Sequence, residues 1–146
     1  MVRQGLAADL DGLTLLGQSS REEFSRRMAA GDHCAVAVAG DRIVGYEWYS
    51  TRAYHMAEPF HYGISVPSDS IYAFDAHIVP EYRVRGVWLS LKEYLACLMR
   101  DLQRSRVLTY VEDGNLLSLR THLRFGFKPY KKVFVVHVPH VFTLSI

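Results

Sequence analysis

The sequence predicts a single α/β domain with a mixed β-sheet, and three observations indicate this class. Segments with strand-like alternation take turns along the chain with segments whose apolar residues recur every three or four positions. Strands that alternate with helices are typical of α/β folds. The 146 residues are enough for one hydrophobic core, and no repeat, low-complexity tract or linker divides them.

The first third of the chain predicts a strand, two helices and a β-hairpin. Leucines at helical spacing predict the first helix, which Gly17 ends. Ser19 or Ser20, followed three residues later by a glutamate, is a capping-box signal for the second helix. Two apolar strands then flank a Gly-Asp turn, which indicates an antiparallel pair. The expected segments are residues 2–4, 8–16, 20–30, 34–38 and 43–50.

The connection formed by residues 51–70 contains interspersed polar and aromatic residues. Its residues Pro59, Gly63 and Pro67 are expected to break any regular element. A connection of this length in a compact domain is usually functional or mobile. Two interpretations remain open: its rings cover a binding pocket, or they seal the edge of the sheet. The side chains concerned are Tyr54, His55, Phe60, His61 and Tyr62.

The centre of the chain is an apolar strand at residues 71–79, a short basic turn and a helix that reaches Leu102. Pro80 stops the strand, and the helix has an apolar stripe from Trp88 onward. The first turn of a helix leaves backbone amides unpaired and has partial positive charge, so it binds phosphate. Arg83, Arg85 and Gly86 would add charge and room for an anion. The alternative is a plain surface turn with solvated arginines.

The last third predicts a strand, a helix and two further strands. Residues 107–111 are β-branched and aromatic, and Asn115 can cap a helix that ends at Gly126. Residues 133–138 and 141–146 are expected to form the final strands, joined tightly at Pro139-His140.

Two motifs resemble those of the GNAT superfamily of acyl-CoA-dependent N-acetyltransferases. The turn Arg83-Val84-Arg85-Gly86-Val87-Trp88 is similar to the phosphate loop Q/R-x-x-G-x-G/A, with Trp88 at the position of the last Gly or Ala. Downstream, the stretch from Asn115 through Ser118 and His122 to Phe127 resembles N-x-x-A/S-x-x-x-Y-x-x-x-G-F. His122 stands where the motif has Tyr.

The resemblance covers nearly the whole chain and implies the GNAT fold. This fold has a central, mixed, mainly antiparallel twisted sheet of six to seven strands, flanked by about four helices. The implied reaction is direct transfer of an acetyl group from acetyl-CoA to a primary amine of an unidentified acceptor, without a metal. Backbone amides of residues 84–88, beside Arg83, would hold the pyrophosphate, and Asn115 and Ser118 would lie near the pantetheine. The oxyanion donors would be backbone amides within residues 76–79, at a bulge where the central strand splays from its neighbour, with Ile78 the first choice and Val79 next to it.

Asp75, His77 and His122 are the candidate catalytic side chains. The period of two in a strand places Ala73, Asp75 and His77 on one face. Either Asp75 or His77 takes a proton from the amine, directly or through water; alternatively, His77 is a hydrogen-bonded core residue and Asp75 a partner of a backbone turn. The resemblance implies that His122 protonates the departing thiolate. The alternative is that His122 packs against the strand and water supplies the proton.

Composition and charge exclude several other classes. A net charge of +2 is too small to indicate nucleic-acid binding, and no apolar run is long enough to span a membrane. The chain starts without an apolar leader, so we expect a soluble cytoplasmic protein. Cys34 and Cys97 lie in apolar surroundings and are expected to be buried, reduced thiols. The histidines lack metal-ligand spacing.

Two further expectations concern partners and the alternative function. An exposed last strand could pair with a second copy of the chain, so a homodimer is possible. A non-catalytic acyl-CoA-binding or interaction domain on the same fold is the alternative to an enzyme. The departures at Trp88 and His122 motivate this alternative.

Overall fold

The computed structural model describes residues 1–57, 61–138 and 142–145 of the chain. Backbone contacts group the chain into two compact units. Unit 1 comprises residues 1–53 and 66–109, and unit 2 comprises residues 54–65 and 110–146.

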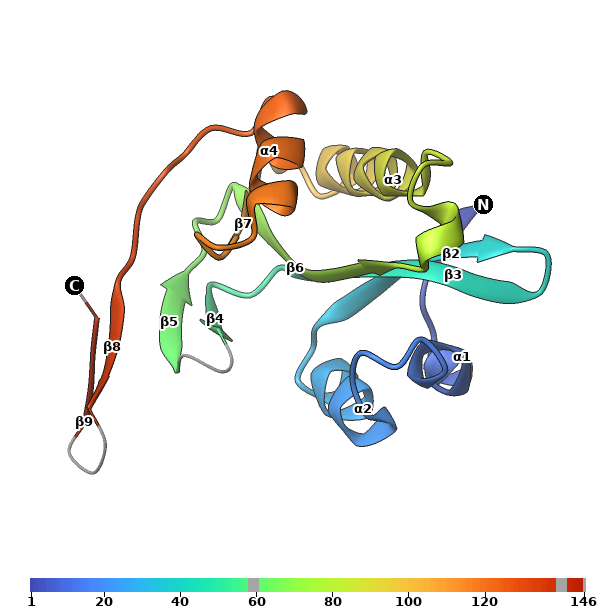
Figure 1. Ribbon diagram of the computed structural model, residues 1–146, viewed down its shortest axis with the longest axis horizontal. Helices are drawn as coiled ribbons and strands as arrows, with labels where there is room; N and C mark the ends of the chain where they lie inside the picture. Colours follow the sequence, from blue (N-terminus) through green and yellow to red (C-terminus); the bar gives the residue numbers. More distant parts are fainter. Residues whose placement is uncertain (58–60, 139–141, 146) are drawn as a thin grey trace. The chain divides into compact units, whose positions relative to one another are not determined.

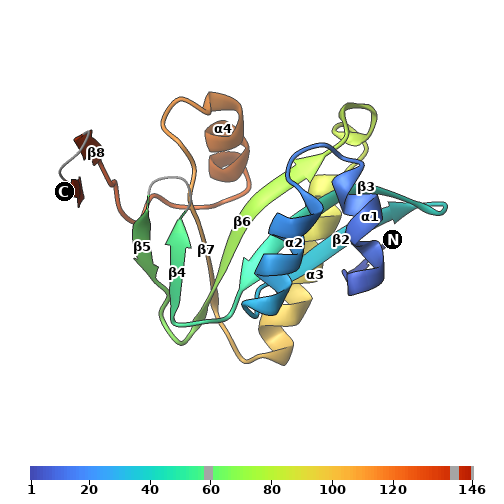
Figure 2. The ribbon, with the colours of Figure 1, turned by 90° about the horizontal axis from the view of Figure 1, so that it is seen from below.

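Unit 1 is a five-stranded sheet with helices on both faces. The strand order is β1-β2-β3-β6-β7, in which β7 runs parallel to β6 and the other neighbours are antiparallel. Helices α1 and α2 cover one face and α3 covers the other (Figures 1 and 2). The elements are β1 (Val2–Gln4), α1 (Leu10–Thr14), α2 (Arg21–Ala29), β2 (His33–Ala39), β3 (Arg42–Ser50), β6 (Ser70–Ile78), α3 (Val87–Asp101) and β7 (Arg106–Thr109), with 3-10 turns η1 (Ala7–Asp9) and η2 (Pro80–Tyr82).

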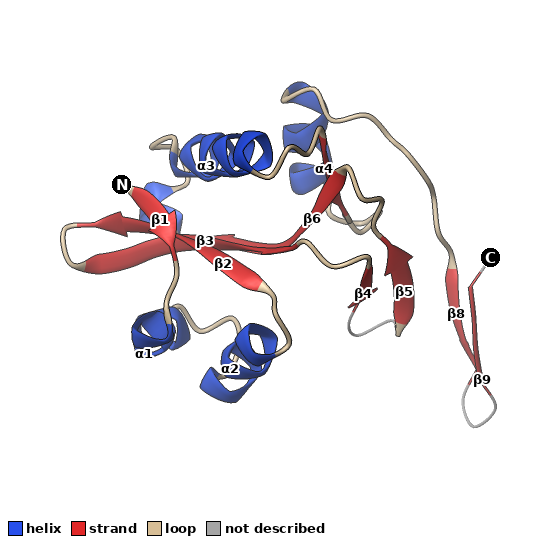
Figure 3. Ribbon diagram, turned by 180° about the vertical axis from the view of Figure 1, so that it is seen from behind, coloured by secondary structure: helices blue, strands red, loops and turns tan. Residues whose placement is uncertain are grey.

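The described residues of unit 2 form one helix and two antiparallel strand pairs, β4 with β5 and β8 with β9. Its elements are β4 (Tyr54–Ala57), β5 (Tyr62–Ser65), α4 (Leu116–Arg124), β8 (Val135–Val138) and β9 (Phe142–Ser145). Figure 3 shows the strands of both units in red. The nine strands of the described residues are thus divided between one five-stranded sheet and two pairs. The tight turn expected at residues 139–140 lies outside the described residues.

The expectation that the 51–70 connection has no regular element is wrong. Strands β4 and β5 pair from Tyr54 opposite Ser65 to Ala57 opposite Tyr62, with Gly63 inside β5. A Cβ on Gly63 would lie 2.2 Å from the Tyr54 hydroxyl oxygen. Gly63 therefore makes room for the Tyr54 ring of the paired strand, and here a glycine permits a strand instead of breaking it.

The predicted caps form as the sequence indicates. The Ser20 hydroxyl accepts a hydrogen bond from the Glu23 amide at 3.1 Å, which begins α2. The Asn115 side chain accepts one from the Ser118 amide at 3.1 Å, which begins α4. Local side-chain bonds therefore set where both helices begin.

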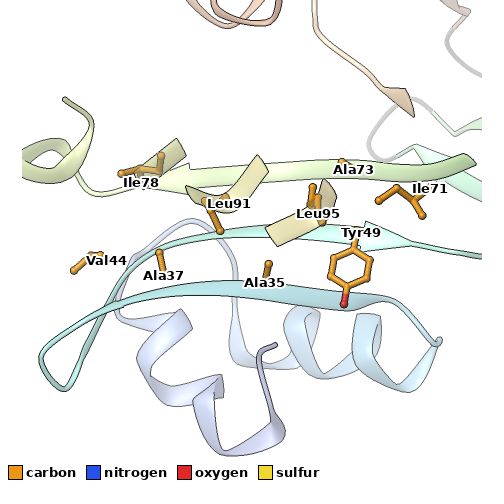
Figure 4. Close-up of a cluster of buried hydrophobic side chains, with 9 residues drawn as sticks. All are labelled: Ala35, Ala37, Val44, Tyr49, Ile71, Ala73, Ile78, Leu91 and Leu95. Atoms are coloured by element: carbon orange, nitrogen blue, oxygen red, sulfur yellow. The ribbon is translucent and has the colours of Figure 1, made fainter. Parts of the chain in front are cut away.

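On the α3 face of the sheet, the core is mainly aliphatic. Leu91 and Leu95 of α3 are almost fully buried and point at Ala35, Ala73 and neighbouring side chains of the sheet (Figure 4). Burying one leucine side chain stabilises the fold by about 2 kcal/mol. The stripe predicted from the sequence is therefore the face by which α3 packs on the sheet.

On the α1 and α2 face, the core combines aromatic and aliphatic side chains. Phe24 of α2 stacks on Trp48 of β3, with ring centroids 5.7 Å apart, and meets Tyr46 edge-on. Cys34 is buried in this cluster, and its burial raises the pKa of the thiol. Cys97 is also a free thiol but is exposed, so its expected burial is wrong. It follows Leu95 by two residues, which places it about 200° around the helix from the buried stripe.

Candidate active site

A β-bulge interrupts the pairing of β6 with β3 at Asp75. Glu47 pairs with Ala76 and Trp48 with Phe74, so Asp75 is the extra residue. Its φ angle is +44°, in the left-handed region that Asp tolerates better than most residues.

This bulge corrects the prediction that Ala73, Asp75 and His77 share one face. Ala73 belongs to the core on the α3 face, whereas His77 lies opposite Tyr46, whose ring is in the core on the α1 and α2 face. The inserted residue shifts the alternation of β6 by one position, so that Ala73 points to the opposite face from Asp75 and His77.

After the bulge, the Ile78 amide points away from β3. The Val79 amide donates to the Val44 carbonyl at 3.0 Å, so Val79 faces β3 and its neighbour Ile78 faces the opposite edge. The Ile78 carbonyl accepts from Arg83 Nε at 3.0 Å instead of from β3, which agrees with this orientation. On that edge β7 pairs only with residues 70–73 of β6. Within the described part of unit 1, the Ile78 amide therefore lies on a stretch of this edge where no strand pairs with β6. The Val79 amide is already hydrogen-bonded to Val44 within the sheet.

Asp75 is held by residues of α2 and β3. Arg27 of α2 forms an ion pair with the Asp75 carboxylate, and the Tyr46 hydroxyl donates to the same carboxylate at 3.4 Å. Burial and the Asp75 charge raise the pKa of Tyr46, so this phenol remains a donor. These contacts agree with the alternative that Asp75 has a structural role. Its partners, however, are the side chains of Arg27 and Tyr46, and not the expected backbone turn.

His77 lies beside this group. Its ring centroid is 6.0 Å from that of Tyr46. Partial burial is the main cause that lowers the pKa of His77; the Arg83 charge lowers it further, and the Asp75 charge opposes the shift. A neutral imidazole at pH 7 can accept a proton, so His77 has the protonation state that a general base needs.

The start of α3 is shaped for an anion. Gly86 precedes the helix with a φ of +76°, and a Cβ on it would meet no atom within 4 Å. The amides of Arg83 and Arg85 donate within the turn, to Pro80 and Tyr82. Across the described chain, no backbone carbonyl accepts from the amides of Val84, Gly86 or Val87. These three amides, beside two exposed arginines, can bind phosphate oxygens.

The Trp88 indole packs away from this turn. It is half-buried against the core on the α3 face, and Lys92 Nζ lies 5.1 Å from its ring centroid. Lys92 in turn forms an ion pair with Glu47 of β3. The open space at Gly86 shows that the indole does not crowd that glycine.

Sequence reasoning missed the Glu47–Lys92 pair and the Arg27–Asp75 pair. For the first, the signal was a lysine within the apolar stripe of α3, four residues after Trp88, with a glutamate in an apolar strand. For the second, the only local signal was the Glu23–Arg27 spacing on α2, which is typical of an exposed helix face.

In unit 2, α4 brings together Asn115, Ser118 and His122. The His122 Nδ1 atom lies 2.8 Å from the Ser118 carbonyl oxygen and 3.3 Å from its hydroxyl. Because a carbonyl only accepts, Nδ1 bears the proton in this bond. The His122 ring also meets Phe127 edge-on, with centroids 5.0 Å apart. The predicted residues thus form two groups, one in each unit.

The described residues contain neither a metal-ligand cluster nor a helix that could span a membrane. In residues 1–57, 61–138 and 142–145, no three His, Cys, Asp or Glu side chains are grouped to hold a metal ion. Within the same ranges, the helices are too short or too polar to cross a membrane.

Comparison with known proteins identifies the fold. The aminoglycoside N-acetyltransferase AAC(6')-Iy in complex with CoA is similar, with a TM-score of 0.72, 17% identity, and 94% of this chain and 98% of that chain covered. The aminoglycoside 6'-N-acetyltransferase AAC(6')-IG from Acinetobacter haemolyticus has a TM-score of 0.71 at 14% identity, covering 94% and 97%. A transcriptional regulator from Bacillus halodurans C-125 has a TM-score of 0.71 at 13% identity, covering 94% and 99%.

Neither a protein-family model nor a curated protein matches the sequence. At these identities the likeness in structure establishes the fold and not the reaction. The expected fold is confirmed, although its main sheet has five strands and not the expected six to seven, because the other described strands form separate pairs. This chain has the GNAT fold of the aminoglycoside N-acetyltransferases.

Proposed function

We propose that this protein transfers an acetyl group from acetyl-CoA directly to a primary amine. The observation that supports this most is the end of β6, where the bulge at Asp75 is followed by the outward-facing Ile78 amide and, across η2, by the start of α3. One short segment therefore offers a donor for a developing oxyanion and a site for phosphate. The fold shared with CoA-bound N-acetyltransferases agrees with this.

Acetyl-CoA would supply the reactive thioester, and the residues at the start of α3 fit its pyrophosphate. The amides of Val84, Gly86 and Val87 would donate to the phosphate oxygens. Arg83 and Arg85, both exposed, would add formal positive charge beside them. The positive end of the α3 dipole acts in the same direction.

The remaining residues would handle the oxyanion and the protons. The Ile78 amide would donate to the thioester oxygen as negative charge develops there. His77, neutral at pH 7, would take the proton of the amine directly or through water, since Asp75 is already paired with Arg27. The candidate donor of a proton to the departing thiolate is His122, as the resemblance implies.

The first test is the thermal midpoint of the protein with and without acetyl-CoA. A ligand at about 100 times its Kd stabilises the fold by roughly 2.7 kcal/mol, which moves the midpoint of a domain of this size by several degrees. Gly86→Val is the matched variant, because φ is +76° there and a β-branched residue would distort the turn. The wild-type midpoint should rise and that of the variant should not. No rise for a folded wild type would contradict the phosphate site.

The second test measures thiol release from acetyl-CoA with a panel of amines that starts with aminoglycosides. His77→Gln should lower kcat by about 10²–10⁴-fold, the usual contribution of a general base. His33→Gln is the control, since His33 stacks on Tyr49 at the far end of β3 and has no part in the proposed chemistry. Equal rates for the two variants would rule out His77 as the base.

The second candidate function is a non-catalytic domain that binds an acyl-CoA. The departures at Trp88 and His122 favour it, as does the similarity to a transcriptional regulator. This candidate predicts a rise in thermal midpoint with acetyl-CoA and no thiol release with any amine of the panel.

A further inference from the structure

Arg27 of α2 lies in surroundings that are unusual for a helix-surface arginine. Its side chain is only 16% exposed, and its guanidinium carbon lies 5.3 Å from the ring centroid of Trp48 and 5.5 Å from that of Phe74. The Phe24 ring is 5.9 Å away. Three aromatic rings from α2, β3 and β6 therefore surround one cation.

Two carboxylates complete the surroundings of Arg27. Its Nε donates to Glu23 at 2.9 Å, and its NH1 group pairs with Asp75. Glu23 belongs to the same helix, whereas Asp75 is the bulged residue of β6. Arg27 is thus the charged link between α2 and the bulge.

The Asp75 backbone conformation needs such a link. A non-glycine residue at a φ of +44° is strained and persists only where surrounding contacts hold it. The Asp75 side chain is 29% exposed, so its carboxylate is partly desolvated and depends on a paired cation. Without the Arg27 guanidinium, the carboxylate would gain by turning to water, and β6 could relax toward regular pairing.

We propose that Arg27 is a positioning residue that holds the β6 bulge and thereby aims the Ile78 amide and the His77 ring at the reacting group. The inference rests on the proposed acetyl transfer for its catalytic part. Its structural part, the control of the bulge by α2, stands without that reaction. Arg27 itself touches neither substrate nor reacting atoms.

The first experiment follows hydrogen exchange of individual backbone amides by NMR in the intact protein. Arg27→Met should speed exchange of the Val79 amide, which bonds to Val44 after the bulge, by roughly tenfold, the effect of about 1.4 kcal/mol of lost local stability. Arg26→Met is the matched control, because Arg26 is an exposed neighbour on α2 that pairs with Glu23. It should leave the exchange unchanged.

The second experiment separates positioning from general stability. Arg27→Lys keeps the charge but lacks the planar fork that spans Glu23 and Asp75. We expect kcat to fall by up to about a hundredfold, the cost of misplacing a catalytic group by ~1 Å, with an unchanged KM for acetyl-CoA. The double variant Arg27→Met/Asp75→Asn should recover stability, because no unpaired charge remains, and should not recover kcat.

The third experiment measures the pH dependence of kcat/KM. The charged or titratable groups around His77 are Tyr46 from β3, Asp75 on its own strand, Arg83 after η2, and Arg27 with Glu23 from α2. Arg27→Met leaves the Asp75 charge unopposed, so the acid limb should move to higher pH. Asp75→Asn removes that charge, so the limb should move to lower pH.

The outcomes distinguish this inference from the proposed function. Altered exchange in Arg27→Met without turnover by the wild type would support control of the bulge and reject acetyl transfer. The positioning role would be overturned by the following result. The wild type turns over, and both Arg27→Met and Arg27→Lys match Arg26→Met in amide exchange and in kcat. If Arg27→Met does not fold, Arg27→Lys and the double variant decide by the same comparison.

Discussion

The buried Glu47–Lys92 pair gives a prediction whose size follows from burial. Each of the two side chains is only 3% exposed, and no described residue hydrogen-bonds to the second carboxylate oxygen of Glu47. Lys92→Met removes the cation and keeps the length of the side chain. It should lower the free energy of unfolding by about 3–5 kcal/mol, because an uncompensated charge then lies between α3 and β3.

The double variant Glu47→Leu/Lys92→Met should regain most of this loss, since replacing both members of a buried pair by apolar residues is often neutral or stabilising. Urea denaturation followed by circular dichroism measures all three free energies. Arg21→Met is the control: the Arg21–Asp11 pair is 51% and 83% exposed, so its loss should cost at most about 1 kcal/mol. A cost below about 1 kcal/mol for Lys92→Met, or no recovery in the double variant, would refute the reasoning.

Three further predictions test the packing and the charge of unit 1. Gly45→Ala should lower the free energy of unfolding by about 1–3 kcal/mol, because the new Cβ would lie 3.0 Å from the His77 carbonyl oxygen. Urea denaturation measures this free energy, and an unchanged urea midpoint would contradict the prediction. Leu91→Ala should lower the free energy of unfolding by about 2–5 kcal/mol in the same assay, since Leu91 of α3 is fully buried against the sheet. A loss near zero would mean that α3 does not pack as described. The pKa of His77 is lower in the folded protein than its ordinary 6.5, so the unfolded chain binds more protons in this pH range. The free energy of unfolding should therefore fall as the pH drops below 6.5. In His77→Gln this dependence on pH should be absent.

The order and type of most elements of unit 1 could be predicted because local chemistry decides them. Ser20 fixes the start of α2 through its own hydrogen bond, and the leucines of α3 mark the buried face. The two apolar strands around the Gly-Asp turn pair as expected in β2 and β3. These signals act over a few residues, so one sequence suffices to read them.

The 54–65 hairpin shows where local signals mislead. Gly63 and two prolines indicate a break, yet the Tyr54 ring on the paired strand fills the place of the missing Cβ and a strand forms. The decisive contact joins residues that lie nine positions apart. Turn residues alone therefore predict the wrong state here.

The resemblance implies a bulge in the central strand, but the residues alone do not place it at Asp75, because its cause lies far away in the sequence. Alternation in residues 71–79 predicts an unbroken strand with Asp75 and Ala73 on one face. The residue that pairs with Asp75 is Arg27, 48 positions earlier and on a helix whose sequence indicates a solvated face. A charge that looks exposed in a helical pattern can therefore mark a buried link to another element.

The departure at Trp88 can be understood in the same way. A loop that ends in Gly or Ala leaves the first turn of α3 without a large side chain, whereas here an indole packs on the core and lies over Lys92. Lys92 is buried because Glu47 neutralises it, and Glu47 pairs with Ala76, the residue directly after the bulge. The two missed ion pairs thus approach the same point of β6 from opposite faces, Arg27 through Asp75 and Lys92 through Glu47. If both hold the bulge, a charge-neutral replacement of either pair should preserve the fold and still lower kcat. A replacement of the Glu47–Lys92 pair that leaves kcat unchanged would assign the control of the bulge to α2 alone.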